Sequence, residues 1–497
     1  MSLLDADSCY RQLCARDAVA DGRFFVAVRT TGVYCRPICP ARTPRRENCD
    51  FHRTAAAAEQ AGFRPCLRCR PELAPAHWPV LDSESRLGRA LALMSDGIME
   101  RGGVAALADA MQLGTRQLGR LFNAELGVTP SALWQTQRLL LAKQLLHDSA
   151  LSITDIAMAA GFRSLRRFNE HFLAVHGQPP SRLRRQRAAP TGLPLRLGYP
   201  GAYDWQAMLD FLRMRAWSGM EVIAAGCYHR AVMFDGVIGA VRVSYLPHRQ
   251  ALQVEWHAVA PRHLPTLLRK VRRLFDLDAD LPSIEAHLRA DPALAARIDA
   301  RPGLRLPGAW SVFEAGLRAL LGQQITVTAA RRLGDSLLDA CAALQPGLPW
   351  GLHRVLPEPS KLSPEHLSTL RMPQARRHAI GQWAQHQASP SAIRQRGRSL
   401  QDSLQCLLDR PGIGDWSAHY IALRGLREPD AFPASDIGLL RAMSPAGQPR
   451  MDAASLRLRA ESWRPWRAYA AQHLWASDTD FALFNQDPIN QEPDHVS

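Results

Sequence analysis

Long hydrophobic segments are missing from this sequence. No apolar run reaches roughly 18 residues, the length that crosses a bilayer as a helix, so no transmembrane helix is expected. The first residues, Met1 to Asp7, lack the basic stretch and the apolar core of a secretory signal peptide. We therefore expect a cytoplasmic protein without a membrane partner, in which crowded cysteines indicate a metal site rather than disulfides.

Acidic residues are fewer than basic residues. The 497 residues include 46 Asp and Glu against 61 Lys and Arg, which gives a net charge of +15. An excess of this size favours a polyanionic partner, and nucleic acid is a better match than a membrane surface. An Arg-rich composition without such a partner is the alternative that charge alone leaves open. The length predicts three or four domains, and a hydrophobic content of 46% is enough for several cores.

Cysteine is rare after residue 70 but crowded before it. Four of the early cysteines form two clips, with three residues between the members of the first pair and two between those of the second. Soft thiolates in two short clips suit a tetrahedral Zn²⁺ ion, and the predicted ligands are Cys35, Cys39, Cys66 and Cys69. Four free thiols are the alternative. The other early cysteines have no partner at ligand spacing and are expected to be packing residues: Cys9, Cys14 and Cys49.

The pattern of apolar residues divides the chain into four regions. The cysteine clips occupy residues 1–75, and a helical pattern runs over 85–187. In 196–290 apolar and polar residues alternate on both sides of a turn at 247–249, which predicts antiparallel strands. Residues 300–483 are helical again. The expected fold class is multidomain and mainly α with α+β parts: a small zinc-bound α/β domain, a double helix-turn-helix domain, an α/β subdomain and a helical domain.

Two segments of the second region have the pattern of a helix, a turn and a second helix. The first is Val104–Thr115, followed by a helix to about residue 124. The second is Ser152–Phe162, followed by a helix over about 164–173. An ordinary helical bundle is the alternative, and two successive units argue against it. Because helix N-termini in the major groove read bases while flanking arginines hold phosphates, we expect these residues to contact DNA: Arg116, Arg120, Arg163, Arg166 and Arg167.

The segment Leu407–Ala418 is the most informative part of the sequence. Gly412 and Gly414, in Pro-Gly-Ile-Gly, permit a tight turn between two helical patterns and leave backbone amides exposed. These amides precede a helix, where the dipole favours an anion such as a DNA phosphate. Asp436 follows 22 residues after Gly414. A Gly-x-Gly turn alone is more often a helix connection, and for Asp436 alone a helix N-cap (Ser435 or Asp436) is as well expected as a role in a site. Together they resemble the helix-hairpin-helix DNA glycosylases.

The residues around the cysteine clips resemble a second family. Phe25–Pro37 and Ala61–Cys69 are similar to the N-terminal domain of the Ada protein of the adaptive response to alkylation. The resemblance implies that a zinc-bound thiolate, here Cys35, takes the methyl group from a methylated DNA phosphate. Such a thiolate is kept deprotonated by zinc, and its conversion to a thioether would reduce repulsion from DNA. A purely structural zinc site is the alternative.

The paired helix-turn-helix units resemble the AraC family of transcription activators. The second unit ends in His171-Phe172 and in a Gly-x-Pro-Pro sequence at 177–180. The resemblance implies promoter DNA as a ligand and RNA polymerase as a further partner.

Residues 196–483 resemble AlkA, the inducible 3-methyladenine DNA glycosylase, over nearly its whole length. Besides the hairpin, the similar segments include Arg301–Gly308, Leu320–Gln323 and Trp463–Tyr469. The resemblance implies a base pocket between an α/β subdomain and helical subdomains. It makes Asp436 the catalytic acid, whose carboxylate stabilises an oxocarbenium-like state. It makes Trp416 and Trp475 the aromatic walls that attract a flipped cationic base. For two further pocket candidates, Tyr420 and Phe211, core packing is equally expected.

The sequence departs from this family at positions that bear on mechanism. Gln324 stands where AlkA has the Leu that wedges into the duplex, and Ala476 replaces an aromatic residue, which predicts a wider pocket. Relatives that also cut the strand have Lys where this chain has Trp416, so we expect a monofunctional enzyme. No cysteine follows Cys406, so the four-cysteine iron–sulfur site of some relatives is not expected. A monovalent cation at the hairpin is a further expectation.

These features predict an alkylation-response protein that combines repair and regulation. The expected activity is hydrolysis of the N-glycosidic bond of alkylated bases such as 3-methyladenine, fused to a methylphosphotriester-sensing activator. One alternative is a regulator whose glycosylase half binds DNA without cutting. Another is a repair enzyme whose front half only recruits it to DNA. We expect a monomer located at the bacterial nucleoid.

Overall fold

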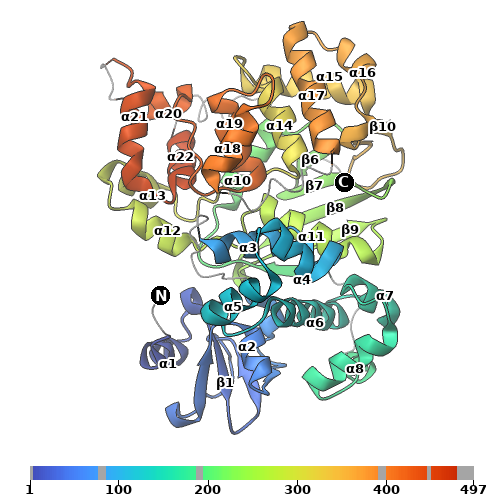
Figure 1. The fold of residues 1–497 in the computed structure, drawn as a ribbon, viewed down its shortest axis with the longest axis vertical. Coiled ribbons are helices and arrows are strands. Elements are labelled where there is room, and N and C mark those ends of the chain that lie inside the picture. The colour runs from blue at the N-terminus through green and yellow to red at the C-terminus, as the bar shows by residue number, and fades with distance from the viewer. Residues whose placement is uncertain (1–3, 76–84, 186–193, 390–398, 445–448, 478–497) are drawn as a thin grey trace.

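The computed structural model describes residues 4–75, 85–185, 194–389, 399–444 and 449–477 (Figure 1). The expected domain ends at residues 187 and 483 lie outside these ranges. We call residues 4–185 the front half and residues 194–477 the rear half. Figure 1 shows a small sheet at one end of the molecule, a larger sheet in the middle and a helical layer at the other end. The multidomain, mainly α class with α+β parts is confirmed.

The small sheet holds the cysteine clips. Its strand order is β3-β1-β2-β4, with only the short β2–β4 pair parallel. Helix α1 begins after Asp5, whose carboxylate caps two backbone amides, and α2 begins after Thr54, which caps one. The elements are α1 (Ala6–Ala15), β1 (Phe25–Val28), β2 (Val33–Cys35), β3 (Cys49–His52), α2 (Ala55–Gln60) and β4 (Arg64–Pro65).

The region after it is helical, as the sequence predicted. Gly103 has a non-helical conformation inside α4, so the first helix of the first helix-turn-helix unit starts there. The long helix α6 connects the two units, and all of its last seven residues, 142–148, are buried. The helices are α3 (Arg86–Ser95), α4 (Ile98–Ala110), α5 (Thr115–Leu126), α6 (Pro130–Asp148), α7 (Ile153–Ala159), α8 (Leu165–His176) and α9 (Pro180–Arg185).

The rear half begins with an antiparallel five-stranded sheet of order β5-β9-β8-β7-β6. The predicted alternation is confirmed, since Val243 pairs with Val254 and both are fully buried. Helices α10 and α11 pack their apolar side chains onto the sheet's core. The elements are β5 (Leu195–Gly198), α10 (Trp205–Arg215), β6 (Glu221–Ala224), β7 (Cys227–Phe234), β8 (Val237–Leu246), β9 (Ala251–His257) and α11 (Leu264–Leu274).

The helical layer has its own hydrophobic core. Helices α12 and α13 contribute Leu281, Ile284 and Leu294 to it, so this core recruits residues that precede position 300. A two-stranded hairpin also interrupts the expected helical pattern. The elements are α12 (Leu281–Leu288), α13 (Pro292–Ala300), α14 (Val312–Leu321), α15 (Val327–Cys341), β10 (Ala343–Leu344), β11 (Arg354–Val355), α16 (Pro364–Ser368), α17 (Gln374–Ala388), α18 (Leu400–Leu408), α19 (Asp415–Ile421), a π-helix (Ala422–Leu426), α20 (Ile437–Ala442), α21 (Ala453–Arg459) and α22 (Arg467–Ala476).

The front and rear halves share one hydrophobic core. Side chains of α6, α7 and α8, among them Leu145 and Phe168, belong to the same buried cluster as Leu197 and Phe275 of the rear half. Ion pairs flank this contact, for example between Arg269 Nη1 and Glu100 Oε1 at 2.6 Å. The front and rear halves are therefore not two independent bodies.

Candidate functional site

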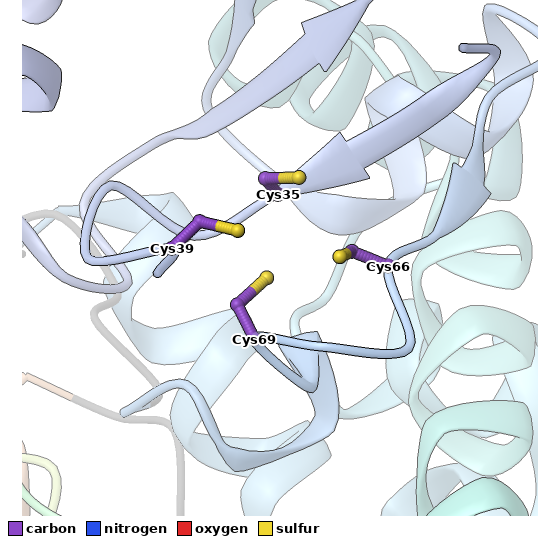
Figure 2. A group of neighbouring side chains, drawn as sticks. All are labelled: Cys35, Cys39, Cys66 and Cys69. Atoms are coloured by element: carbon purple, nitrogen blue, oxygen red, sulfur yellow. The ribbon is translucent and has the colours of Figure 1, made fainter. Parts of the chain in front are cut away.

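The four predicted zinc ligands meet in space. Cys35 ends β2, Cys39 lies in the following loop, and Cys66 and Cys69 follow β4. Their sulfur atoms lie within 4.8 Å of one another, and Figure 2 shows them pointing toward a common centre. All four side chains are buried. The two clips are short loops that the sheet holds together, because β2 and β4 pair in parallel with Tyr34 opposite Pro65.

The surroundings of these sulfurs are polar and partly cationic. The backbone N–H of Arg36 donates to Cys69 Sγ at 3.3 Å, and that of Arg68 donates to Cys66 Sγ at 3.4 Å. The Arg36 guanidinium donates to the carbonyl of Cys69 and forms an ion pair with Asp21. A hydrogen bond from Cys35 contributes most to lowering the pKa of the Cys39 thiol to about 7. Four buried sulfurs in this arrangement fit a tetrahedral zinc ion.

The cysteines outside the clips behave differently from one another. Cys9 and Cys49 are buried in a small core with Phe24, as expected for packing residues. Cys14 is exposed, so its expected packing role is wrong: the last turn of α1 faces solvent there.

The predicted DNA-reading helices present their arginines to solvent. Leu118 and Phe122 of α5 and Phe168 and Phe172 of α8 are fully buried, which fixes the opposite face of each helix outward. Arg166 forms an exposed pair with Glu170, at 3.3 Å. All of the arginines expected to contact DNA are exposed: Arg116, Arg120, Arg163, Arg166 and Arg167.

The two glycines of the hairpin between α18 and α19 differ in backbone conformation and in surroundings. Gly412 has φ of +76°, and a Cβ there would lie 2.5 Å from the Cβ of Ala379. Gly414 has φ of −89° and no neighbouring atom within 4 Å of a Cβ, so the fold does not require glycine there. Both residues are exposed. An open position that still holds glycine fits close approach of an external backbone.

The loop between α14 and α15 is tied to this hairpin. Gln323 Nε2 donates to the carbonyl of Gly412 at 2.8 Å and to Ser417 Oγ at 2.9 Å. The next residue, Gln324, is exposed and has a left-handed φ of +59°, which is uncommon for a side chain other than glycine. Ile325 beside it is 38% exposed. Sequence reasoning singled out Gln324 but missed both the anchoring role of Gln323 and the exposed Ile325.

Asp436 lies where the two predicted aromatic walls converge. The indole N–H of Trp416, on α19, donates to Asp436 Oδ2 at 2.7 Å, and that of Trp475, on α22, donates to Oδ1 at 2.9 Å. Asp436 also caps α20, since its Oδ1 accepts from the backbone N–H of Leu439 at 3.1 Å. Capping and a role in the pocket are therefore compatible. Tyr420 stacks on Trp416, with ring centres 5.1 Å apart.

Phe211, the remaining pocket candidate, is covered. The guanidinium of Arg215 lies 3.9 Å from its ring centre and that of Arg424 lies 4.5 Å from it. Phe211 is 6% exposed. Core packing, the alternative given for Phe211, describes this position better than a base-stacking wall.

The sequence analysis did not identify Arg424 as a residue near the pocket. It lies in the π-helix that continues α19 and donates to the carbonyl of Pro307 and to Gln472 Oε1. Its guanidinium lies 5.1 Å from the ring centre of Trp475, and burial lowers its pKa to about 9. The Arg424 guanidinium therefore packs against the indole of Trp475. In the sequence it is one arginine among many in the helical pattern.

Within the described ranges no helix has the length and apolar character needed to cross a membrane.

Comparison with known proteins extends these observations to the whole chain. Residues 8–72 match the model of the metal binding domain of Ada, 107–186 that of a helix-turn-helix domain and 194–311 that of the AlkA N-terminal domain. The chain is 37% identical over 500 residues, and 98% of both chains, to a probable bifunctional transcriptional activator/DNA repair enzyme AlkA of Mycobacterium tuberculosis.

Two further proteins match the rear half. DNA-3-methyladenine glycosylase 2 of Escherichia coli is 32% identical over 57% of this chain and 96% of that one. The structure of a 3-methyladenine DNA glycosylase from Archaeoglobus fulgidus has a TM-score of 0.51 and 21% identity, covers 58% of this chain and 99% of its own, and supports the fold. The resemblances seen in the sequence are thereby confirmed, and the chain belongs to the family of bifunctional transcriptional activator/DNA repair enzymes AlkA.

Proposed function

We propose that this protein is a 3-methyladenine-type DNA glycosylase fused to a methylation-sensing transcription activator. The rear half hydrolyses the N-glycosidic bond of alkylated bases in duplex DNA. The front half accepts a methyl group from a DNA phosphotriester on Cys35 and reads promoter DNA through its two helix-turn-helix units. The observation that carries the glycosylase part is the carboxylate of Asp436 between the indoles of Trp416 and Trp475.

The chemistry of base excision follows from this arrangement. The flipped base stacks in the pocket between aromatic side chains, which favours electron-deficient alkylated bases. As the bond between the base and C1′ breaks, positive charge develops on the sugar. The base leaves as a neutral molecule with the electron pair of the bond, the Asp436 carboxylate stabilises the charge on the sugar, and water then adds to C1′ and releases a proton to solvent. With both oxygens already accepting N–H groups, Asp436 acts through its charge and is poorly placed to take a proton from water. Relatives that also cut the strand have a lysine at this position. This chain has Trp416 there, so the strand is not cut.

The methyl transfer is a direct displacement. The Cys35 thiolate attacks the methyl carbon of a methylphosphotriester, an S–CH₃ bond forms, the C–O bond breaks and a phosphodiester anion leaves. Zinc bound by the four cysteines would keep their sulfurs deprotonated at neutral pH. One unit of negative charge is lost from the cysteine site, so its repulsion from DNA phosphates falls and promoter binding strengthens.

DNA is held at several places. The exposed arginines of α5 and α8 bind promoter DNA, and the backbone at Gly412 and Gly414 binds a phosphate beside the damaged base, assisted by a monovalent cation. Gln324 enters the space that the flipped base leaves. The exposed Ile325 next to it supplies part of the apolar contact that the missing Leu would make. We further propose a monomer at the nucleoid that recruits RNA polymerase.

Two measurements on the full chain test the proposal. Excision of 3-methyladenine from a duplex by the wild-type protein, with loss of activity in Asp436→Asn, tests the rear half. Mass mapping after exposure to methylphosphotriester DNA tests the front half, and the methyl group is expected on Cys35. A protein that binds DNA but releases no base would favour the regulator-only alternative. Methyl on another cysteine would contradict the Cys35 assignment.

A further inference from the structure

A cluster of buried charged side chains lies where three distant parts of the chain meet. Glu72 follows the second cysteine clip, Lys143 and Asp148 lie on α6 of the helix-turn-helix domain, and Arg196 lies on β5 of the rear half. The side chains of Lys143 and Glu72 are fully buried. Figure 1 places α6 between the sheet that contains β1 and the sheet that contains β8 and β9.

The first part of this cluster joins the cysteine clip to α6. Lys143 Nζ donates to the backbone carbonyl of Cys66, a predicted zinc ligand, at 3.3 Å, and forms an ion pair with Glu72. Arg70, the residue after Cys69, donates to Glu72 at 2.8 Å and to both oxygens of Asp148 at 2.9 and 2.8 Å. The loop that carries two of the four sulfurs is therefore fastened to a helix of another domain.

The second part joins α6 to the rear half. Arg196 Nη2 lies 3.6 Å from Asp148 Oδ1, and Gln144 Nε2 donates to the carbonyl of Arg196 at 2.6 Å. Apolar contacts run alongside, since Leu145 of α6 and Leu195 of β5 belong to one buried cluster. Contacts therefore run without a break from the cysteine clip through α6 to the first strand of the glycosylase half.

Burial makes these contacts cooperative. Displacing one member of a buried ion pair leaves its partner charged and desolvated, which costs more than the pair itself contributes. If the clip moved relative to α6, Glu72 would become exposed or Lys143 would be left buried without its ion-pair partner. If α6 moved relative to β5, the contact between Asp148 and Arg196 would break. The three segments are thus expected to hold their places together or loosen together.

We propose that Lys143 and Glu72 are positioning residues of the cysteine site and that Asp148 and Arg196 extend this positioning to the glycosylase half. The clip, α6 and β5 then behave as one cooperative unit. Loss of the metal, or methylation of Cys35, changes the stability of β5 as well as that of the clip. The methylation arm rests on the proposed function, whereas the metal arm does not.

Hydrogen exchange on the full chain, with zinc bound and after chelation, tests the metal arm. In the wild-type protein, chelation should speed exchange by about tenfold or more in peptides of the clip, of α6 and of β5, because they open together. Peptides from α21, which lies far along the chain in the helical layer, should not change. Unchanged protection of β5 after chelation would overturn the proposal.

Arg196→Met with Arg242→Met as a matched control isolates the second link. Both arginines lie on strands of the same sheet and contact a carboxylate, Asp148 at 3.6 Å for Arg196 and Glu255 at 3.8 Å for Arg242. In Arg196→Met the effect of chelation on β5 should be clearly smaller than in the wild type, because only the hydrogen bond from Gln144 and the apolar contacts still join β5 to α6, while in Arg242→Met the effect should be as large as in the wild type. Equal behaviour of the two variants would contradict the assigned path.

Lys143→Met tests the first link through the rate at which zinc leaves the protein. Zinc release to a chelator should be about tenfold faster than in the wild type, because the clip carrying Cys66 is no longer held. Where this variant folds poorly, Glu72→Gln, which keeps the shape and removes the charge, serves the same purpose. Release at the wild-type rate from both would refute the positioning role.

If Cys35 accepts no methyl group but chelation still loosens β5, the proposed function fails and this inference stands.

Discussion

At the scale of single residues, Asp436 has two structural duties that can be separated. It caps α20 through Leu439 and receives two indole N–H groups in the pocket. Asp436→Asn keeps one acceptor oxygen for the cap, removes the negative charge and places an NH₂ donor where one carboxylate oxygen accepts from an indole N–H. Excision of 3-methyladenine should fall by about 10²–10³-fold, or roughly 2.7–4 kcal/mol, as for loss of one electrostatic stabiliser. Single-turnover excision measures this. Wild-type rates would leave capping as the only role of Asp436.

The indole N–H groups give a second prediction at the same scale. Trp475→Phe keeps an aromatic wall but removes the donor to Asp436 Oδ1. Hydrogen bonds to a charged group contribute about 1.5 kcal/mol, so single-turnover excision should slow by about tenfold with little change in DNA affinity. Trp463→Phe is the control, because Trp463 donates in the same way to Asp291 at 2.8 Å, outside the pocket. That variant should lose stability but keep its rate. Equal slowing in both would point to a general loss of packing.

At the scale of elements, the hairpin glycines should respond differently to substitution. Gly412→Ala meets Ala379 and a left-handed φ, so the melting temperature should fall, with a cost of roughly 1–2 kcal/mol or more. Gly414→Val places its Cβ where no atom lies within 4 Å. It should leave the melting temperature unchanged and weaken binding to undamaged duplex by about tenfold, as for one lost contact to a charged group. Full DNA affinity in Gly414→Val would mean that no phosphate approaches this position.

The docking of α2 on α6 carries a pH dependence. Burial raises the pKa of Glu59 from 4.5 to about 7, although hydroxyl donors on Thr136 and Tyr34 oppose the shift. The folded protein then binds this proton more tightly than the unfolded chain, so stability is lost as pH rises from about 4.5 to 7 and is constant above that. Glu59→Gln should stabilise the front half at pH 8 by about 1–3 kcal/mol and by less at pH 5. If Glu59→Gln changed the unfolding midpoint equally at pH 5 and pH 8, this direction of the pH dependence would be contradicted.

At the scale of the whole molecule, DNA binding should be strongly dependent on salt. The chain carries a net charge of +15, and the arginines of α5 and α8 are exposed. The logarithm of the affinity should fall by roughly 0.9 for each log unit of salt and each phosphate neutralised. Titrations at several salt concentrations measure the slope, and Arg166→Ala should reduce it by about one unit. A flat response would contradict phosphate binding by these helices.

At this scale, the two halves of the chain are packed together around a shared core. The pattern of apolar residues divided the chain into separate regions, but Phe168 of the front half and Phe275 of the rear half lie in one core. No local pattern could show this, because a buried apolar face looks the same in sequence whichever neighbour covers it. The same holds for Lys143, whose charge predicts exposure although its side chain is fully buried against Glu72.

The sequence by itself determined the features that depend on local spacing and residue type. These include the two cysteine clips, the arginine faces of α5 and α8, the Gly412–Gly414 turn and the alternation that forms β8 and β9. Short-range geometry is enough for each, because neighbouring positions of one helix, strand or turn settle it. Asp436, Trp416 and Trp475 were found through resemblance to a family, since residues that lie far apart along the chain carry no local sign that they meet.

Only the tertiary structure decided how these parts act on one another. It showed that both pocket indoles donate to Asp436, that Gln323 ties the Gln324 loop to the hairpin, and that Arg215 and Arg424 cover Phe211. It also brought Glu72, Lys143 and Arg196 together from three separate regions. Such contacts arise when elements pack, and the free energy of burying a charge beside its partner depends on that packing rather than on either residue's neighbours in the chain.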